Sequence, residues 1–364
     1  MTTLARRFAD LRPSIDEASR DALLALLDEI GTSAGADRFV DAALASVRSG
    51  KRFRALLAHF GAAIASGRSL GESEVCELGA ALELYQASAL AHDDLIDHAP
   101  TRRGAPTPHV RFAGLHRDSG WTGSPAEFGA AGAVLLGDLL FSAAERAIGR
   151  QCESIDPSRA FRLLARYTTM HAEVALGQYL DVRAEHLPLD LADDEAVSIE
   201  DAMEVVLRKS AHYSIVHPAM LGAIAAGGGD GLLAALDEIL TPWGIAFQLR
   251  DDDLGVFGDP AATGKPAGDD LREGKRTVLL ALSWRSATDE ERRDLVSVLG
   301  DPDADDEDAT RAAEVVARRG RDAHERIIDA LVAEGEAALD AHGFDDSTRE
   351  DLLELARIIT ARES

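Results

Sequence analysis

Apolar residues recur at helical spacing through most of this chain, and no run alternates as a β-strand would. Apolar positions three and four apart are typical of helices with one buried face. We expect helices at about 37–48, 72–98, 129–151, 158–185, 199–225, 232–257, 276–299, 307–341 and 346–361. A capping box at Ser14 to Glu17 predicts one earlier helix start.

The segments between these helices are too short to be domain linkers. Breakers rich in glycine or proline fall at 100–108, 114–125, 227–231 and 258–268. The glycine run at 227–231 lacks the Lys-Ser/Thr ending of a phosphate loop, so we expect a turn between helices there. We predict an all-α fold in which residues 1–364 form a single domain, a bundle of about ten helices.

Charge and cysteine content exclude some classes of protein. The formal net charge is -26, which argues against binding to nucleic acid. Cys76 and Cys152 make no disulfide framework and indicate the reducing cytoplasm. We see no signal peptide. The most apolar stretch, 128–144, carries Asp138, so we expect a buried core helix and no transmembrane segment.

Three acidic residues, Asp93, Asp94 and Asp97, end the helical pattern at 72–98. At about 100° per residue, Asp94 lies about 100° and Asp97 about 40° from Asp93, so the carboxylates share one face. Clustered carboxylates repel unless a cation lies between them, and magnesium takes one or two carboxylates plus phosphate oxygens. The alternative is a solvated acidic face, because the chain has 64 acidic residues. The apolar turns before Asp93 favour the metal site.

A second acidic cluster repeats this arrangement. Asp251 and Asp252 follow an apolar helical run as Asp93 and Asp94 do. Gly255 stands where the third acid would be, and Asp253 lies on another face. A glycine-rich loop with Lys265 follows. Two such helix ends predict a shared chamber in which magnesium bridges carboxylates to a diphosphate, with Lys and Arg on the remaining phosphate oxygens.

Basic residues are informative in so acidic a chain. Lys51, Arg52 and Arg54 lie within one or two helical turns, and a solvated surface stripe is their alternative interpretation. Lys209 and Ser210 lie in a helical pattern that also carries two histidines. Those histidines, His212 and His217, show no convincing zinc spacing, and we interpret them as ordinary polar or core residues.

The order of these motifs resembles that of the trans-isoprenyl diphosphate synthases, the polyprenyl synthetase family. From about residue 45 to the C-terminus, the chain carries in turn GKRFR, HDDLID, RRG, KS, FQLRDD and GKPAGDDLREGK. Each motif alone is weak, whereas the ordered set is specific. The resemblance implies an all-helical homodimer with a deep central cavity and three Mg²⁺ ions per active site. The implied substrates are isopentenyl diphosphate and an allylic diphosphate (dimethylallyl, geranyl or farnesyl).

The resemblance also implies roles for individual residues. Asp93, Asp94 and Asp97 match the first aspartate-rich motif, in which Asp93 and Asp97 would hold magnesium. Asp251 would hold the remaining ion, supported by Asp252. The matching substrate positions are Arg102, Lys209 and Lys265 for the allylic diphosphate, Lys51, Arg54 and Arg103 for isopentenyl diphosphate, and Gln248 and Ser210 near the reacting carbon.

Two positions depart from the family pattern. A histidine often stands where this chain has Gln86, and glutamine can donate a hydrogen bond but carries no charge. We therefore expect weaker binding of isopentenyl diphosphate. Gly255 removes the third acid of the second motif, yet activity is expected to survive because Asp251 would carry the main coordination.

The implied reaction is ionisation, condensation and elimination. Charge on the leaving diphosphate would be stabilised by magnesium and cations, and the isopentenyl double bond would attack the allylic cation before a proton is lost. A class I terpene cyclase is one alternative, against which Lys51, Arg54 and Arg103 argue because a cyclase needs no isopentenyl site. A non-catalytic subunit of a heteromeric synthase is another; Gly255 fits it, whereas the complete first motif does not.

Residues before the first acidic motif form the cavity wall in this family. Ser88 and Ala89 are small, which argues against a stop at farnesyl. Tyr85 lies about 5.4 Å deeper, one helical turn, which is about the reach of one more isoprene unit. We expect geranylgeranyl diphosphate as the product, with Tyr85 as the floor. In the alternative, Tyr85 packs against a neighbouring helix, Phe141 sets the limit, and the product is farnesyl or longer.

Overall fold

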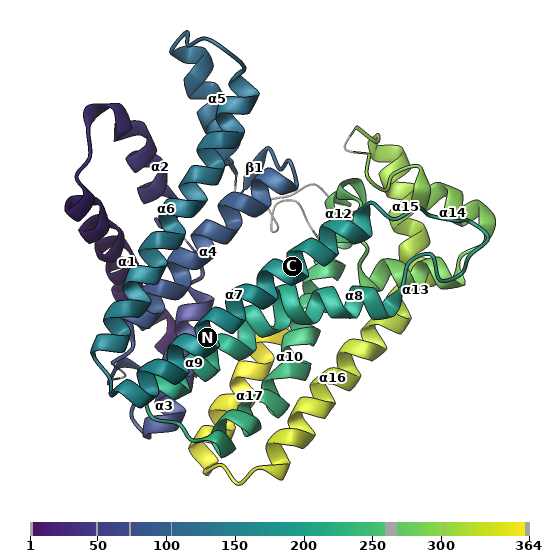
Figure 1. The fold of residues 1–364 in the computed structure, drawn as a ribbon. Coiled ribbons are helices and arrows are strands. Elements are labelled where there is room, and N and C mark those ends of the chain that lie inside the picture. The colour runs from purple at the N-terminus through teal and green to yellow at the C-terminus, as the bar shows by residue number, and fades with distance from the viewer. Residues whose placement is uncertain are drawn as a thin grey trace. The chain divides into compact units, whose positions relative to one another are not determined.

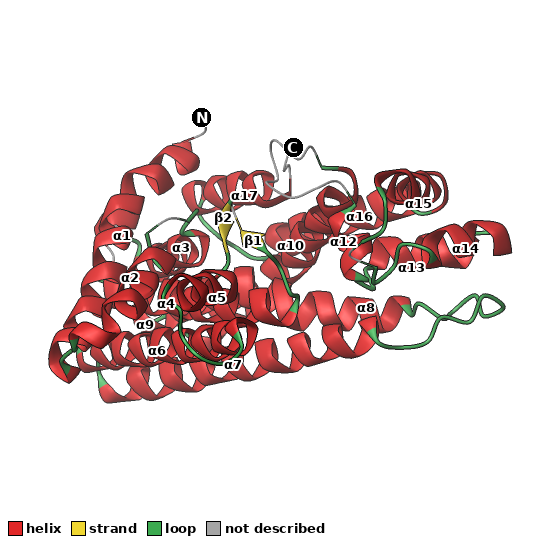
Figure 2. Ribbon diagram, turned by 90° about the horizontal axis from the view of Figure 1, so that it is seen from above, coloured by secondary structure: helices red, strands yellow, loops and turns green. Residues whose placement is uncertain are grey.

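The computed structural model describes residues 3–48, 50–72, 74–102, 104–258, 268–301 and 303–360. Helices dominate these ranges, and the only strands within them are the short pair β1 (Thr101–Arg102) and β2 (Ala105–Pro106) (Figures 1 and 2). The prediction of an all-α fold is confirmed. The chain divides into two compact units, the first being Met1–Tyr167 with Pro218–Leu233, and the second Thr168–His217 with Ala234–Ser364. The single domain stays a prediction.

The first unit is built around helices that pack on one another at close range. Its helices are α1 (Thr3–Ile30), α2 (Asp37–Ser46), α3 (Phe53–Ser66), α4 (Cys76–Ile96), α5 (Pro108–Asp118), α6 (Pro125–Glu153), the first part of α7 (Pro157–Glu185), nearly all of α9 (His217–Ala225) and the start of α10 (Asp230–Phe257). Helix α4 packs against α1 and α6, and α5 packs against α6 (Figure 1). Where α3 meets α9, a methyl group on Gly61 would lie 1.9 Å from the carbonyl oxygen of Ala219, so only glycine allows this approach.

The second unit holds the C-terminal helices around two apolar clusters. It contains the rest of α7 and α10, α8 (Ile199–Val205), the π-helix η3 (Val206–Val216), α12 (Asp269–Glu273), α13 (Val278–Ser286), α14 (Asp289–Val296), α15 (Asp306–Arg319), α16 (Arg321–Ala341) and α17 (Asp346–Thr360). Trp284 centres one cluster, and its indole N–H donates to the carbonyl of Asp193 at 2.8 Å. Leu249, Val278 and Ile328 belong to the other.

The helix start predicted at Ser14 is wrong. Helix α1 starts at Thr3 and continues through Pro13, and the Ser14 hydroxyl donates to a carbonyl three residues back instead of capping. Leu4 and Phe8 are buried, so the first turns are held by packing. This tertiary burial outweighs a local capping signal worth about 1 kcal/mol.

Three α-helices among the described residues were not predicted, and one predicted helix is irregular. Helices α3, α5 and α12 lie in segments for which no helix was predicted; α5 has Pro108 at its first position, where proline starts a helix rather than breaking one. The π-helix interrupts the helix predicted over 199–225. The turn predicted at 227–231 is confirmed over 227–229, which lie between the end of α9 and the start of α10, whereas residues 230 and 231 already belong to α10.

Two predicted helices are each divided in the structure. The helix expected over 276–299 breaks before Thr288, which forms a capping box with Glu291 and so starts α14. The helix expected over 307–341 breaks at Gly320, where a methyl group would lie 2.1 Å from a serine hydroxyl of α13. The first division depends on a local capping box and the second on a contact with another helix, and apolar periodicity reveals neither.

Helices α6 and α10 are long and apolar enough to span a membrane by length and composition alone, a test that core helices of soluble proteins also pass. In α10, 61% of the apolar window is buried, whereas in α6 only 33% is buried. The helix predicted over 128–144 is confirmed as part of α6, but its burial is confirmed for one face only. That face packs in the first unit, whereas Val134, Leu135 and Phe141, elsewhere on α6, are exposed.

Candidate active site

The first acidic cluster lies at the end of α4, beside the β1–β2 hairpin. Asp93 and Asp94 are in the last helical turn, and Asp97 is the C-terminal cap. Arg102 on β1 donates from Nε to Asp94 Oδ1 at 2.5 Å and from Nη2 to Asp93 Oδ2 at 3.1 Å. The three predicted carboxylates and a predicted phosphate-binding arginine therefore lie together within the first unit.

The two aspartates bound by Arg102 differ in exposure. The side chain of Asp94 is 4% exposed and that of Asp93 is 23% exposed. Burial raises the pKa of Asp94; Arg102 opposes the shift without cancelling it, and the charges of Asp93 and Asp97 add to it. Because like charges crowd here, a divalent cation next to Asp93 and Asp97 would relieve repulsion. The donors are all carboxylate oxygens, which fits magnesium.

The three cations near the start of α3 do not form one stripe. Arg52 has a left-handed backbone conformation (φ 54°), is buried, and pairs with Asp16 at 2.5 Å and Glu83 at 3.4 Å. Lys51 is exposed and Arg54 is half-buried. The structure thus separates a structural arginine from Lys51 and Arg54, the two residues predicted to bind isopentenyl diphosphate.

Other predicted substrate positions are placed only in part. Gln86 is half-buried on α4, the helix that carries the first acidic cluster. Ser210 is half-buried on the π-helix. Arg103 and Lys265 lie outside the described residues.

The second acidic cluster lies on α10. Asp251 is exposed, whereas Asp252 is buried and accepts a hydrogen bond from Gln248 Nε2 at 2.8 Å. Arg321 holds both carboxylate oxygens of Asp253, each at 2.9 Å. The prediction that Asp253 lies on another face is therefore confirmed, and Asp251 and Asp252 remain the candidate metal ligands.

At Gly255, where this cluster lacks its third acid, the carboxylate of another residue lies close by. A methyl group on Gly255 would lie 1.9 Å from Asp270 Oδ2, so the carboxylate of Asp270 packs directly against this glycine. Burial raises the pKa of Asp252 well above its ordinary value, and the charge of Asp270 raises it further, as does that of Asp251. This crowding of carboxylates again fits a divalent cation with oxygen ligands.

Lys209 lies on the π-helix and is held by an acidic residue of α7. Its Nζ lies 2.6 Å from Asp181 Oδ2, and Lys275 Nζ lies 3.3 Å from the same oxygen and 2.7 Å from Glu185. Burial would raise the pKa of Asp181, but Lys209 and Lys275 outweigh it, so the pKa is lowered. A methyl group on Gly177 would lie 2.5 Å from the backbone nitrogen of Lys209, so α7 and the π-helix touch closely.

Four residues of these clusters were not predicted as site residues: Asp181, Glu185, Asp270 and Lys275. Asp270 and Lys275 belong to the last motif of the sequence and could have been selected with it. Asp181 lies inside α7 with no local marker. Only its burial beside two lysines distinguishes it from the many other acids of the chain.

The residues predicted to limit chain length lie on the buried side of α4. Tyr85 and Ser88 are buried and Ala89 is half-buried. The Tyr85 ring meets that of Phe141 on α6 edge-on, with 5.9 Å between ring centroids. The two residues that compete as the floor of the cavity are therefore in contact with each other.

A family model described as polyprenyl synthetase matches residues 37–316. The chain belongs to the polyprenyl synthetase family. The family predicted from the ordered motifs is thus confirmed, and the matched range includes both acidic clusters.

Curated members of the polyprenyl synthetase family share about a third of their residues with this chain. A geranylgeranyl diphosphate synthase of Mycobacterium tuberculosis is 33% identical over 326 residues, which cover 89% of this chain and 83% of the relative. A geranylfarnesyl diphosphate synthase of Aeropyrum pernix is 32% identical over 286 residues, covering 78% and 81%.

A solved structure of this family is similar over nearly its whole length. The geranylgeranyl pyrophosphate synthase of Corynebacterium glutamicum, in complex with isoprenyl diphosphate and magnesium, has a TM-score of 0.85 and 37% identity. The match covers 96% of this chain and 99% of that one.

Proposed function

We propose that this polyprenyl synthetase condenses isopentenyl diphosphate with an allylic diphosphate to build a linear isoprenoid diphosphate. The pair of acidic clusters carries the proposal, since each consists of carboxylates that crowd one another next to a cationic side chain. In the first unit Arg102 forms ion pairs with Asp93 and Asp94. In the second unit Lys209 forms an ion pair with Asp181, and the charge of Asp181 also raises the pKa of Asp252.

The oxygen-only donors of both clusters are those that magnesium prefers. Asp93 and Asp97 would hold it on the allylic diphosphate, and Asp251 and Asp252 would hold the remaining ion, with three ions in all. Magnesium, when bound, supplies electrostatic stabilisation of the leaving diphosphate. The other proposed binding residues are Arg102, Lys209 and Lys265 for the allylic diphosphate, Lys51, Arg54, Arg103 and Gln86 for isopentenyl diphosphate, and Gln248 and Ser210 near the reacting carbon.

The chain's own side chains stabilise the leaving group and hold it in place. Arg102 presents a planar set of N–H donors, and the ammonium group of Lys209 is positioned by Asp181. Positive charges of this kind would favour cleavage of the allylic C–O bond, because negative charge grows on the departing diphosphate. The isopentenyl double bond then forms the new C–C bond, and the lost proton goes to the departed diphosphate. No protein nucleophile is required.

We propose geranylgeranyl diphosphate as the product, as the names of several relatives suggest. Two small residues of α4, Ser88 and Ala89, precede the first acidic cluster, and Tyr85 lies about one helical turn further from that cluster. A reducing cytoplasmic location is also proposed, since both cysteines are free thiols.

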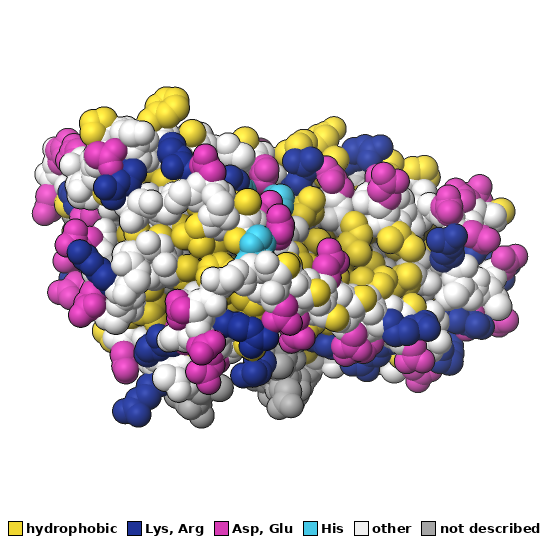
Figure 3. All heavy atoms as spheres, turned by 90° about the horizontal axis from the view of Figure 1, so that it is seen from below, with side chains coloured by type: hydrophobic (Ala, Val, Ile, Leu, Met, Phe, Trp, Pro, Cys, Tyr) yellow, Lys and Arg dark blue, Asp and Glu magenta, His cyan; other side chains and the backbone are white. Residues whose placement is uncertain are grey.

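We further propose that the chain acts as a homodimer. On α6, Val134, Leu135 and Phe141 are exposed, and Phe161 and Leu164 are exposed on the part of α7 that belongs to the first unit. Figure 3 shows hydrophobic side chains reaching the surface between acidic and basic ones. The exposed apolar residues of α6 and α7 would be shielded from water if a second copy of the chain covered them.

The reaction is tested with purified protein, Mg²⁺, isopentenyl diphosphate and each of dimethylallyl, geranyl and farnesyl diphosphate, followed by chain-length analysis. We expect elongation that chelation abolishes and Mg²⁺ restores. Asp93→Asn and Asp251→Asn should each lower kcat on the order of 10²–10³-fold, as loss of a charge-stabilising group does. Asp118→Asn, at an exposed position ending α5, is the control and should keep full activity. Folded protein that elongates no primer would overturn the proposal in favour of a non-catalytic subunit or a cyclase.

A further inference from the structure

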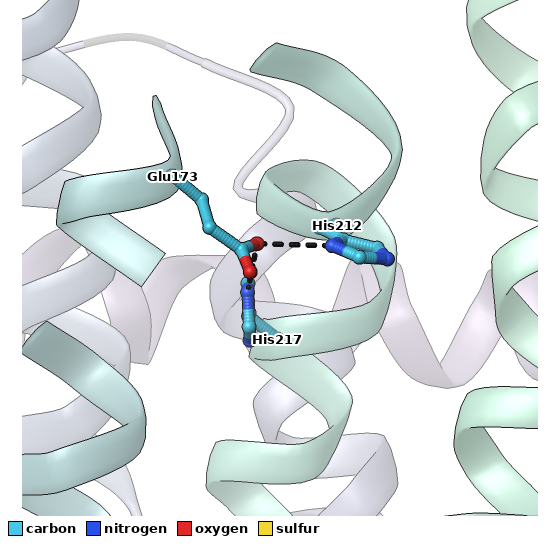
Figure 4. Close-up of side chains that lie close together, drawn as sticks. All are labelled: Glu173, His212 and His217. Atoms are coloured by element: carbon cyan, nitrogen blue, oxygen red, sulfur yellow. Dashed lines mark hydrogen bonds and ion pairs between the residues drawn. The ribbon is translucent and has the colours of Figure 1, made fainter. Parts of the chain in front are cut away.

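Three side chains that the proposed reaction does not use converge in the second unit. Glu173 comes from α7, His212 from the π-helix, and His217 from the start of α9. The same carboxylate oxygen, Glu173 Oε2, lies 2.9 Å from His212 Nδ1 and 2.9 Å from His217 Nε2 (Figure 4). The three ligand atoms lie within 4.8 Å of one another.

The π-helix explains why this convergence is invisible in the sequence. Residues five apart in an α-helix lie about 140° apart around its axis, so His212 and His217 would point in different directions. A π-helix bonds residue i to residue i+5, which places such residues one turn above each other. Here the backbone N–H of His217 donates to the carbonyl of His212, so the π-turn joins these two residues directly.

The environment of the cluster suits an ion. The side chain of His217 is 2% exposed, while those of His212 and Glu173 are 22% and 21% exposed, so one ligand is anchored and two can adjust. Burial would raise the pKa of Glu173, but the hydrogen bonds from His217 and His212 outweigh it, and the pKa is lowered. Glu173 is therefore ionised at neutral pH, as a ligand must be.

We propose that Glu173, His212 and His217 form a binding site for a divalent transition-metal ion of the zinc class, separate from the magnesium ligands of the two acidic clusters. Imidazole nitrogens favour zinc-like ions, whereas magnesium prefers oxygen ligands alone. Two histidines and one glutamate are a known zinc ligand set that leaves a position open for water.

The required adjustment is small. Bonds of about 2.0–2.2 Å around a tetrahedral ion place ligand atoms about 3.3 Å apart, so the carboxylate must retreat from each ring by about half an ångström. The ring protons move to His212 Nε2 and His217 Nδ1, so both rings bind in neutral form. The rings already stand at 74° with centroids 5.5 Å apart and do not block each other.

The bound ion would tie α7 to the π-helix. Lys209 lies three residues before His212 on that helix and contacts α7 through Asp181. The ion would therefore stabilise the same helix pair that positions Lys209. A simple hydrogen-bonded pair, such as His342 with Glu238 at 3.0 Å, has only two ligating side chains and offers a matched comparison.

The test uses the full chain, stripped of metal by a chelator and dialysed, with Mg²⁺ in excess and no diphosphate present. Zn²⁺ binding is measured by calorimetry, and Co²⁺ binding by its visible absorption. We expect one ion per chain and a raised melting temperature. His212→Gln and Glu173→Gln should each weaken binding at least about tenfold, whereas His342→Gln should bind as the unaltered chain does.

The proposal is overturned if the unaltered chain binds Zn²⁺ no more tightly than His212→Gln does, or if His342→Gln weakens binding equally. It is also overturned if excess Mg²⁺ abolishes Co²⁺ absorption. Circular dichroism of each variant separates lost binding from lost folding. Because no diphosphate or turnover is involved, the outcome is independent of the proposed prenyl transfer.

Discussion

At the scale of single residues, neighbours of the same chemical type have different roles. Asp252 is buried beside Gln248, whereas Asp253, one position on, is held by Arg321. Lys51 is exposed, whereas Arg52 is buried in ion pairs. A helix turns about 100° per residue, so adjacent side chains meet different surroundings.

We predict that any side chain at position 255 destabilises the fold, because Asp270 lies against Gly255. In Gly255→Ala the new methyl group would lie 1.9 Å from Asp270 Oδ2, and overpacking of this kind costs about 1–3 kcal/mol. We expect the free energy of unfolding, measured with urea, to fall by that amount. Gly231→Ala is the control, since nothing lies within 4 Å of a methyl group there. In Gly255→Ala/Asp270→Ala the two effects should be non-additive by about 1 kcal/mol; simple additivity would contradict direct contact.

His324 is predicted to make stability depend on pH. Burial lowers its pKa to about 4 from an ordinary value of 6.5, so below pH 6.5 the unfolded chain binds a proton that the folded chain does not. Stability therefore rises with pH between about 4 and 6.5, and this residue alone accounts for about 1.6 kcal/mol between pH 5 and 6.5.

Urea denaturation at pH 5 and 6.5 measures this contribution. His324→Gln should reduce the difference between the two unfolding free energies by about 1.6 kcal/mol. His342→Gln removes a histidine that is 29% exposed and should leave the difference nearly unchanged. Equal effects of the two substitutions would show that burial is not the cause.

At the scale of elements, function depends on where helices end and on how they deviate from regularity. Helix α4 ends in the first acidic cluster, and Arg102 on the adjoining hairpin forms hydrogen bonds with two of its three carboxylates. The π-helix carries Lys209, Ser210 and His212, and His217 of the proposed zinc site follows at the start of α9. Such π segments are rare in proteins as a whole, and those that occur are frequently found at functional sites.

Product length is predicted to depend on α4. Tyr85→Ala would remove the proposed floor and lengthen the proposed cavity by about one helical turn, about 5.4 Å. We therefore expect products longer by one isoprene unit. Chain-length analysis with farnesyl diphosphate as primer measures the shift. Phe141→Ala should leave product length unchanged. The reverse pattern, with longer products from Phe141→Ala alone, would make Phe141 the floor.

At the scale of the whole molecule, the chain exposes apolar surface that a single copy does not cover. Val134 and Leu135 on α6 are 43% and 58% exposed. Association of two copies would remove this area from water, at about 25 cal/mol per Å² of apolar surface.

Dimer formation is predicted to fail when a charge enters this face. Val134→Glu should convert the dimer to monomer in analytical ultracentrifugation, because a carboxylate buried without a partner costs several kcal/mol. Val296→Glu changes a valine of similar exposure, 41%, on α14 and should leave the dimer intact. A dimer that persists in Val134→Glu would place the interface elsewhere.

The helical class, the family and the two acidic clusters follow from the amino-acid sequence alone. Helical periodicity and the spacing of Asp93, Asp94 and Asp97 are local properties, fixed by the repeat of 3.6 residues per turn. Motif order likewise needs no tertiary contact. These features are therefore predictable without knowledge of the tertiary structure.

Which residues of distant segments meet depends on tertiary packing. Asp181 is distinguished by two lysines that lie 28 and 94 positions further on, and Asp270 by its contact with Gly255. The start of α1 depends on buried Leu4 and Phe8. The cluster of Glu173, His212 and His217 depends on a π-helix, whose altered repeat brings together residues that α-helical spacing would separate. Each of these is a long-range or irregular feature, which local periodicity does not encode.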